Sequence, residues 1–218
     1  MNRSKALILD LDDTIFETKT MDQKVFEPFF QHLRKRLEST FNQAATDMII
    51  ADLWEKTWDK VIQKHAIPKE MILDSIKVLD DLELDLTISP YPDYSFLKDI
   101  PYPKYLVTTS LTSLQQAKIR ALNIEKDFVK IVINDTFKET RTKLDIFKEL
   151  MNEFNLVPEN TFVIGDNTES EIKAGNELNM VTIQMLRKNV VKGTTATYYI
   201  KSFEELQKIL DSNANHTN

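Results

Sequence analysis

Three carboxylates crowd the end of the first apolar run of the sequence. Asp10, Asp12 and Asp13 follow the run at residues 5–9 directly, in the stretch KALILDLDDT. Like charges held this close repel one another, and this costs stability unless something positive lies among them. The stretch therefore indicates a site that holds a cation or a cationic side chain.

Polar groups also follow the later apolar runs. They are Thr108, Thr109 and Ser110, then Lys138, Arg141 and Lys143, then Asp166, Glu169 and Glu171. In a parallel sheet, ligands bind beyond the carboxyl ends of the strands, so we expect these groups to converge. Mg²⁺ prefers oxygen ligands and is usually held by one or two carboxylates plus a substrate phosphate. Hydroxyls and a lysine can bind the phosphoryl oxygens while negative charge redistributes over them in the transition state. The set is therefore typical of phosphoryl transfer.

Short apolar runs separated by helical segments predict an α/β protein. Such runs, typical of buried parallel strands, occur at residues 5–9, 104–108, 129–133, 161–164 and 180–183, with a further one at 198–200. Segments of helical periodicity lie at 115–122, 144–154 and 171–178, and a last helix starts near residue 202. This alternation predicts a doubly wound parallel sheet with helices on both faces.

The stretch between the first strand and Pro90 breaks this rhythm. It has no strand signal and contains about three amphipathic segments, near residues 25–37, 50–61 and 68–79. We therefore predict a core made of residues 1–17 and 89–212 with a helical insertion at 18–88. The polar residues 213–218 are predicted to form a disordered tail.

The composition limits the classes of function. A net charge of −6 argues against a nucleic-acid surface, which would need a basic face. The chain has no cysteine, so disulfides and thiolate metal sites are excluded. No apolar run approaches the roughly 20 residues that a membrane span needs, and the first strand leaves no room for a signal peptide. We expect a cytoplasmic protein that binds neither nucleic acid nor membrane; the oligomeric state is left open.

Four motifs in order resemble those of the haloacid dehalogenase-like (HAD) hydrolase superfamily. They are LDLDDT at 9–14, LVTTS at 106–110, a lysine just before a helix, and FVIGDNTESEIKAG at 162–175. The resemblance covers nearly the whole chain, and the helical insertion lies where that superfamily carries a helical cap. It implies a Rossmann-like core with an inserted helical cap domain that closes over the site.

The resemblance also implies a role for each motif residue. Asp10 would attack phosphorus and become an aspartyl-phosphate, and Asp12 would be the general acid and then the general base. Thr108 would bind the phosphoryl group beside Thr109, and Lys143 would steady that group and the nucleophile. Asp10, the backbone carbonyl of Asp12, and Asp166 would hold Mg²⁺.

Some residues have a second interpretation. The family's frequent Lys-Pro pair is missing, so Arg141 is an alternative to Lys143 as the phosphate-stabilising cation. Thr108 could be structural, although Thr112–Gln115 already makes a capping box for the next helix. Glu171 stands where the family more often has Asp; it could complete a capping box at Thr168–Glu171 or act near the metal. Trp54 and Trp58 lie on an apolar stripe and are predicted to pack in the cap.

The sequence thus predicts a Mg²⁺-dependent phosphatase that hydrolyses a small phosphorylated metabolite through an aspartyl-phosphate. A 2-haloacid dehalogenase or a phosphomutase of the same fold, or a binding protein that has lost turnover, is the alternative. The substrate is not given by the sequence. Candidate specificity residues in and near the cap are Glu17, Lys19, Arg34 and Trp54.

Overall fold

The short apolar runs form the strands of one parallel sheet in the computed structural model, which describes residues 5–55, 58–82 and 84–212. Within these ranges the strands are β1 (Ala6–Leu9), β2 (Lys104–Thr109), β3 (Lys130–Asn134), β4 (Thr161–Gly165), β5 (Val181–Met185) and β6 (Tyr198–Ile200). Their order in the sheet is β3-β2-β1-β4-β5-β6. Every neighbouring pair is parallel.

The sheet reverses its winding at β1, which lies between β2 and β4. Leu9, the last residue of β1, pairs with Leu106 of β2 and with Ile164 of β4. In doubly wound sheets, the crevice beyond the carboxyl ends at this reversal is where ligands bind. Asp10 and Asp166 come just after the two strands that meet there.

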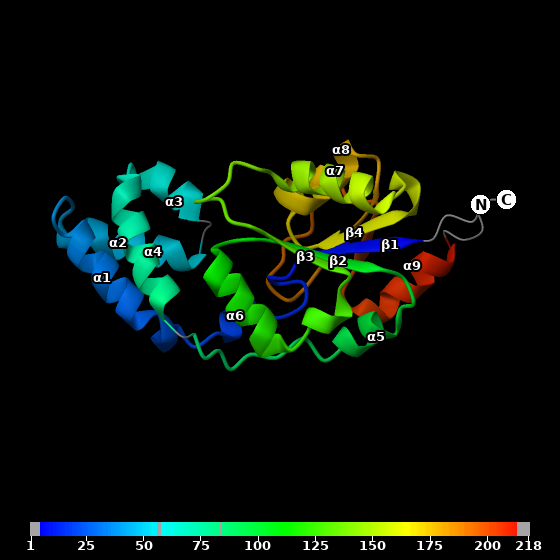
Figure 1. Cartoon of the computed structure of the whole chain (residues 1–218), viewed down its shortest axis with the longest axis horizontal. Helices are drawn as coiled ribbons and strands as arrows, with labels where there is room; N and C mark the ends of the chain where they lie inside the picture. Colours follow the sequence, from blue (N-terminus) through cyan, green and yellow to red (C-terminus); the bar gives the residue numbers. More distant parts are fainter. Residues whose placement is uncertain (1–4, 56–57, 83, 213–218) are drawn as a thin grey trace. The chain divides into compact units, whose positions relative to one another are not determined.

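Helices cover both faces of the sheet in the unit formed by residues 1–20 and 88–218. They are α5 (Tyr94–Asp99), α6 (Thr112–Leu122), α7 (Lys143–Phe154), α8 (Lys173–Glu177) and α9 (Leu206–Ser212). Figure 1 shows α7 and α8 on one face and α5, α6 and α9 on the other. Short helical turns complete the unit at Thr18–Thr20, Glu125–Asp127, Pro158–Asn160, Thr168–Ile172 and Phe203–Glu205. The predicted doubly wound α/β fold is confirmed.

One apolar cluster fastens α7 to the sheet. It joins alternate residues of the central strands to the buried stripe of α7, where residues 146, 147 and 150 recur at helical spacing. Its buried members are Ala6, Ile8, Tyr105, Val107, Ile146, Phe147, Leu150, Val163, Ala174 and Met180. Because α7 begins at Lys143, this packing also fixes where the Lys143 side chain starts.

The second unit spans residues 21–87 and is helical. Its helices are α1 (Glu27–Leu37), α2 (Gln43–Glu55), α3 (Trp58–His65) and α4 (Lys69–Asp81), preceded by a turn at Gln23–Phe26. The segment near 50–61, predicted as one amphipathic stretch, contains parts of both α2 and α3. The insertion predicted at 18–88 covers this unit, and its action as a cap stays a prediction.

Aromatic rings pack together inside the helical unit. The Phe30 ring centroid lies 4.7 Å from that of Trp54, and Phe29 stacks on Trp58 at 5.2 Å. Both tryptophans thus contribute to packing, as the apolar stripe indicates. No helix in the described ranges has an apolar stretch long enough to cross a bilayer. The tail predicted at 213–218 lies outside the described residues.

Candidate active site

Asp10 lies buried at the end of β1. Its backbone N–H donates to the carbonyl of Ile164, so the hydrogen-bonded sheet continues one residue beyond the strand and fixes the position of Asp10. The side chain is only 9% exposed. Lys143 donates from Nζ to Oδ1 of Asp10 at 2.7 Å. A buried carboxylate of this kind needs a cationic partner, and Lys143 supplies it.

Lys143 is delivered by the first turn of α7. Thr142 is the N-cap, and its hydroxyl and the carboxylate of Asp145 form a reciprocal capping box. The Nζ atom of Lys143 also lies 2.8 Å from Oε2 of Glu171. Arg141 instead pairs with the half-buried Glu139 and the exposed Glu149. Of the two candidate cations, the structure brings Lys143 to Asp10.

Glu171 reaches the same point from the segment after β4. Its Oε1 accepts from the backbone N–H of Asn167 at 2.6 Å, and it is 2% exposed. The capping box predicted at Thr168–Glu171 is wrong by one residue, because Asn167 is the N-cap of this π-helical turn. Gly165 leaves the space for this side chain, since a Cβ there would lie 2.3 Å from Oε1 of Glu171.

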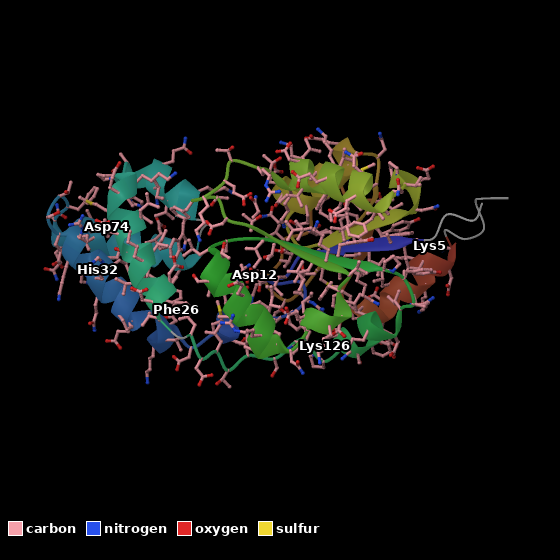
Figure 2. All side chains as sticks on the ribbon, in the orientation of Figure 1. Lys5, Asp12, Phe26, His32, Asp74 and Lys126 are labelled. Carbon is pink, nitrogen blue, oxygen red and sulfur yellow. The ribbon has the colours of Figure 1, made fainter. Side chains whose placement is uncertain are left out.

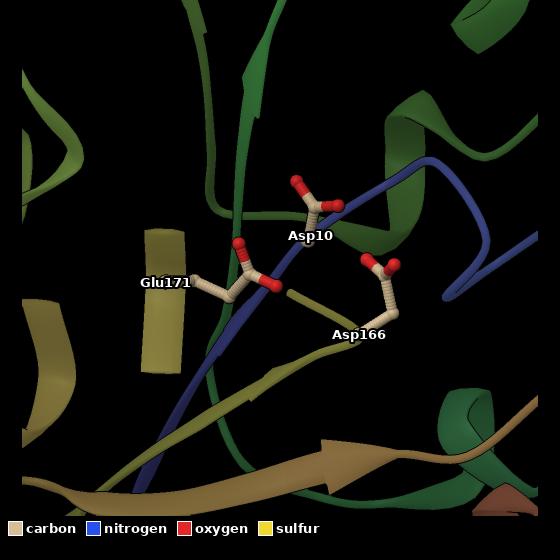
Figure 3. A group of neighbouring side chains, drawn as sticks. All are labelled: Asp10, Asp166 and Glu171. Atoms are coloured by element: carbon tan, nitrogen blue, oxygen red, sulfur yellow. The ribbon is translucent and has the colours of Figure 1, made fainter. Parts of the chain in front are cut away.

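Three carboxylates converge here from separate segments. Asp10, Asp166 and Glu171 each offer an oxygen, and these oxygens lie within 4.8 Å of one another. Figure 3 shows the three side chains as neighbours, carried by the segments after β1 and β4. All-oxygen donors of this spacing fit a hard divalent cation such as Mg²⁺. The residues present therefore fit the predicted metal.

The electrostatics of this group indicate a deficit of positive charge. Burial, aided by the charges of Glu171 and Asp12, raises the pKa of Asp10 to about 7 despite the nearby Lys143. Burial and the charges of Asp10, Glu171 and Asp13 raise the pKa of Asp166 to about 8. One ammonium cannot neutralise three carboxylates, so a bound cation would let all three ionise.

Asp12 faces a different set of partners. Gln115 donates from Nε2 to its Oδ2 at 2.8 Å, and Lys118 donates from Nζ to its Oδ1 at 2.6 Å. The Thr18 hydroxyl is 3.3 Å from the same Oδ1. Burial would raise the pKa of Asp12, but the charge and hydrogen bond of Lys118, with the other donors, hold it below its ordinary value. Figure 2 labels Asp12 beside α6, the helix that carries Gln115 and Lys118.

Thr108 and Thr109 end β2 on the same edge of the sheet. Thr108 is buried and its hydroxyl accepts from Gln115, whereas Thr109 is exposed. The capping box predicted at Thr112–Gln115 is wrong. Leu111 is the N-cap of α6, and the Thr112 hydroxyl and N–H both donate to Asp135. Gln115 is thereby available to Asp12 and Thr108.

A cavity of about 240 Å³ opens beside Asp166. Its lining residues are Asp13, Tyr91, Asp166, Asn167, Thr168, Arg187, Asn189, Val190 and Val191. Arg187 lies over the Tyr91 ring at 3.9 Å and pairs with Asp93. It also donates to the carbonyl of Thr14, so it braces the loop that carries the first carboxylates.

Sequence reasoning missed Gln115, Lys118 and Arg187. A signal existed for the first two, since α6 buries Leu114, Ile119 and Leu122 and yet places a glutamine and a lysine in the same buried stripe. A polar or charged residue in an apolar stripe needs a buried partner. Arg187 offered no such pattern, because its partners come from distant segments.

The family model for haloacid dehalogenase-like hydrolases matches residues 4–179. The chain belongs to this family. The predicted superfamily is confirmed, and with it the class of enzyme, a hydrolase.

Individual relatives of this haloacid dehalogenase-like hydrolase agree with the fold. A glyceraldehyde 3-phosphate phosphatase from Methanocaldococcus jannaschii is 25% identical over 94% of this chain and 96% of its own length. A haloacid dehalogenase-like protein from Streptococcus pneumoniae matches with a TM-score of 0.67 at 18% identity, covering 96% of this chain and 99% of the other. The L-2-haloacid dehalogenase from Xanthobacter autotrophicus matches at 0.57 and 12% identity, with coverage of 96% and 99%. The fold is thus shared by proteins named for different reactions.

Proposed function

We propose that this chain is a Mg²⁺-dependent phosphatase that hydrolyses a small phosphorylated metabolite through an aspartyl-phosphate on Asp10. The observation that carries the proposal is the three-carboxylate group, with Lys143 paired to Asp10 and Glu171, at the reversal point of the sheet. A phosphate ester is anionic, and a carboxylate can approach it only where other positive charge offsets the repulsion.

Asp10 is the nucleophile in this proposal. An oxygen of its carboxylate forms a bond to phosphorus as the bond from phosphorus to the leaving alcohol oxygen breaks. Asp12, which the negative charge of the bound phosphate would favour in its protonated form, gives a proton to that oxygen, and it then takes a proton from the water that attacks the acyl-phosphate. Water releases inorganic phosphate and restores Asp10.

Lys143 and Thr108 bind the phosphoryl oxygens. The Lys143 ammonium already lies 2.7 Å from Asp10, so a phosphoryl group on that carboxylate would remain within its reach. The Thr108 hydroxyl, at the end of the neighbouring strand, and that of Thr109 add donors for the same oxygens. Arg141, paired on the surface, has no part in this step.

Asp10, Asp166 and Glu171 would hold Mg²⁺, with the backbone carbonyl of Asp12 as a further ligand. The ion supplies positive charge that offsets repulsion between the nucleophile and the phosphate. Glu171 also accepts from Lys143 and from Asn167, so it orients the ammonium as well.

The substrate is proposed to be a small phosphorylated metabolite, with triose phosphates the first candidates. This choice is supported by relatives named glyceraldehyde 3-phosphate phosphatase, among them the one from Methanocaldococcus jannaschii. The helical unit is proposed to select the substrate, and Arg34 and Trp54 remain its candidate residues with Glu17 and Lys19 nearby in sequence. A cytoplasmic location, without nucleic-acid or membrane partners, belongs to the same proposal.

A metabolite screen tests the proposal. The purified chain is incubated with a panel of phosphate monoesters that includes glyceraldehyde 3-phosphate, with and without Mg²⁺, and inorganic phosphate is measured. Release that requires the metal supports the phosphatase. Halide release from a 2-haloacid without metal would support a dehalogenase instead, and transfer of the phosphoryl group between hydroxyls of a sugar would support a phosphomutase.

A further inference from the structure

Two residues of α6 meet Asp12 from one face of the helix. Gln115 and Lys118 are three residues apart, so their side chains lie one above the other on that face. Gln115 contacts Oδ2 of Asp12 and Lys118 contacts Oδ1, so each carboxylate oxygen has its own donor from the same helix. Such a two-point hold fixes both the position and the rotation of the carboxylate.

The Gln115 amide also connects Asp12 to Thr108. Its NH₂ group has two N–H donors, and Nε2 is within hydrogen-bond distance of both Asp12 and the Thr108 hydroxyl. The opposite orientation of the amide would set Oε1 against the Asp12 carboxylate, oxygen against oxygen. Gln115 therefore links the proposed acid–base residue to the proposed phosphate-binding hydroxyl.

Packing alone would favour apolar side chains at the positions of Gln115 and Lys118. The Lys118 side chain is 4% exposed, its ammonium lying over the Phe16 ring at 5.7 Å, and Asp12 is its ion-pair partner. Apolar residues of similar volume are often at least as stabilising as a buried ion pair. The Oε1 atom of Gln115 is buried without a hydrogen-bond partner among the described residues, which costs stability. Local costs of this kind are typical of functional sites.

The helix itself is anchored at its start. Asp135, directly after β3, accepts from the N–H and the hydroxyl of Thr112, the first residue of α6. The neighbouring strand end thus fixes the end of α6 nearest to Gln115. The contacts of Gln115 and Lys118 with Asp12 are thus made from a helix whose first turn is anchored.

We propose that Gln115 and Lys118 are positioning residues that hold the Asp12 carboxylate, and through Gln115 the Thr108 hydroxyl, in place for phosphoryl transfer. This inference rests on the proposed function. Asp12 acts on the leaving-group oxygen, so loss of its position should matter most for alcohols that leave poorly without a proton. Loss of Gln115 should in addition weaken binding of the phosphoryl group through Thr108.

The test measures release of the leaving group in a single turnover, which reports the attack on phosphorus alone. Lys118→Met and Gln115→Leu are compared with Arg120→Met and Gln116→Leu, matched changes at exposed positions of the same helix. An alkyl phosphate and 4-nitrophenyl phosphate serve as poor and good leaving groups. We expect Lys118→Met to slow the alkyl ester by about 10²–10³-fold and the nitrophenyl ester at least about tenfold less.

Two further readouts separate positioning from general damage to the fold. Gln115→Leu should raise KM severalfold while Lys118→Met leaves KM within about twofold, and Lys118→Arg, which keeps the charge, should recover part of the rate. Equal losses on both esters, or losses matched by the exposed controls, would overturn the inference. If Lys118→Met does not fold, Gln115→Leu carries the same leaving-group comparison, since it removes no charge.

Crystal structures of the variants decide the matter without an assay of activity. In Lys118→Met and Gln115→Leu, the Asp12 carboxylate should leave its present position while Asp10 stays in contact with Lys143. An Asp12 that does not move in either variant contradicts the inference. A wild-type chain that hydrolyses no phosphate ester would refute the proposed function, and the crystal structures would still show whether the two residues hold Asp12.

Discussion

The ammonium of Lys143 lies 2.7 Å from Oδ1 of Asp10, although 133 residues separate the two in sequence. The same ammonium lies 2.8 Å from Glu171, so two buried carboxylates share it. Asp166 adds a third carboxylate to the group. This imbalance of charge is the property on which most of the following predictions depend.

Lys143→Met should abolish most of the activity. Loss of the ammonium removes a charge that would stabilise the transferring phosphoryl group, and we expect kcat to fall by about 10²–10³-fold. Removing one partner of a buried ion pair should also lower the free energy of unfolding by about 3–5 kcal/mol. Arg141→Met, two residues away and paired only on the surface, is the matched control. Similar losses of kcat in both variants would reject Lys143 as the phosphate-binding cation.

Asp166→Asn should weaken Mg²⁺ binding without unfolding the protein. Burial raises the pKa of Asp166 to about 8, so its ionised form is costly when no metal is bound. The variant should therefore be at least as stable as the wild type in a chelator, and titration calorimetry should show a large loss of affinity for Mg²⁺. Asp99→Asn, at an exposed position, serves as the control. Unchanged affinity in Asp166→Asn would remove this residue from the metal site.

Metal-free stability should fall as the pH rises. The pKa values of Asp10 and Asp166, about 7 and about 8, stand above the ordinary 3.8. The folded state thus keeps protons that the unfolded chain loses, so these groups stabilise the fold at low pH and lose this contribution as the pH rises through 7 and 8. A divalent cation binds the ionised groups and should raise the melting temperature more at about pH 8 than at about pH 5.5.

Thermal unfolding in chelator and in Mg²⁺ at both pH values checks this dependence. In an Asp10→Asn/Asp166→Asn double variant, the melting temperature should depend much less on pH and on Mg²⁺. If Mg²⁺ raises the melting temperature of the wild type equally at both pH values, these two carboxyls do not cause the pH dependence.

Asp10 and Asp12 should give opposite results when the phosphoenzyme is measured. Asp10→Asn should end turnover without a covalent adduct. In Asp12→Asn, Asp10 should still attack the phosphorus of a substrate with a good leaving group, such as nitrophenyl phosphate, and hydrolysis of the adduct should slow by about 10²–10⁴-fold. Mass spectrometry after rapid quenching should then detect a species about 80 Da heavier. An adduct on Asp10→Asn, with none on Asp12→Asn, would reverse the two roles.

Gly165→Ala should displace Glu171. The new Cβ would lie 2.3 Å from Oε1 and 2.4 Å from Cγ of Glu171, so the side chain must give up its contacts with Lys143 and Asn167. We expect a loss of about 1–3 kcal/mol in the free energy of unfolding, together with weaker Mg²⁺ binding. Adding Glu171→Asp, which shortens the side chain, should recover part of the metal affinity. Full metal affinity in Gly165→Ala alone would argue that Glu171 has no part in the site.

The sequence by itself determined the strands, their alternation with helices and the carboxylates after β1 and β4. Each of these is local, because apolar runs and polar strand ends can be recognised without knowing what packs against them. The four motifs and their order, which are also read directly from the sequence, predicted the family. The prediction of a helical insertion at 18–88 between the first two strands was also local, since that stretch contains amphipathic segments and no strand signal.

Only the tertiary structure decided which side chains meet. Lys143 and Arg141 are two residues apart in one polar connection, and the packing of α7 on the sheet turns Lys143 inward and leaves Arg141 on the surface. Thr112 and Gln115 form a plausible capping box in sequence. In the structure, however, the Thr112 hydroxyl donates to Asp135 and the Gln115 amide donates to Asp12. Hydrogen bonds between distant segments override local ones when burial leaves a carboxylate that needs donors. The sequence does not show which of these hydrogen bonds forms, because the choice depends on distances between segments that are set when the helices pack on the sheet.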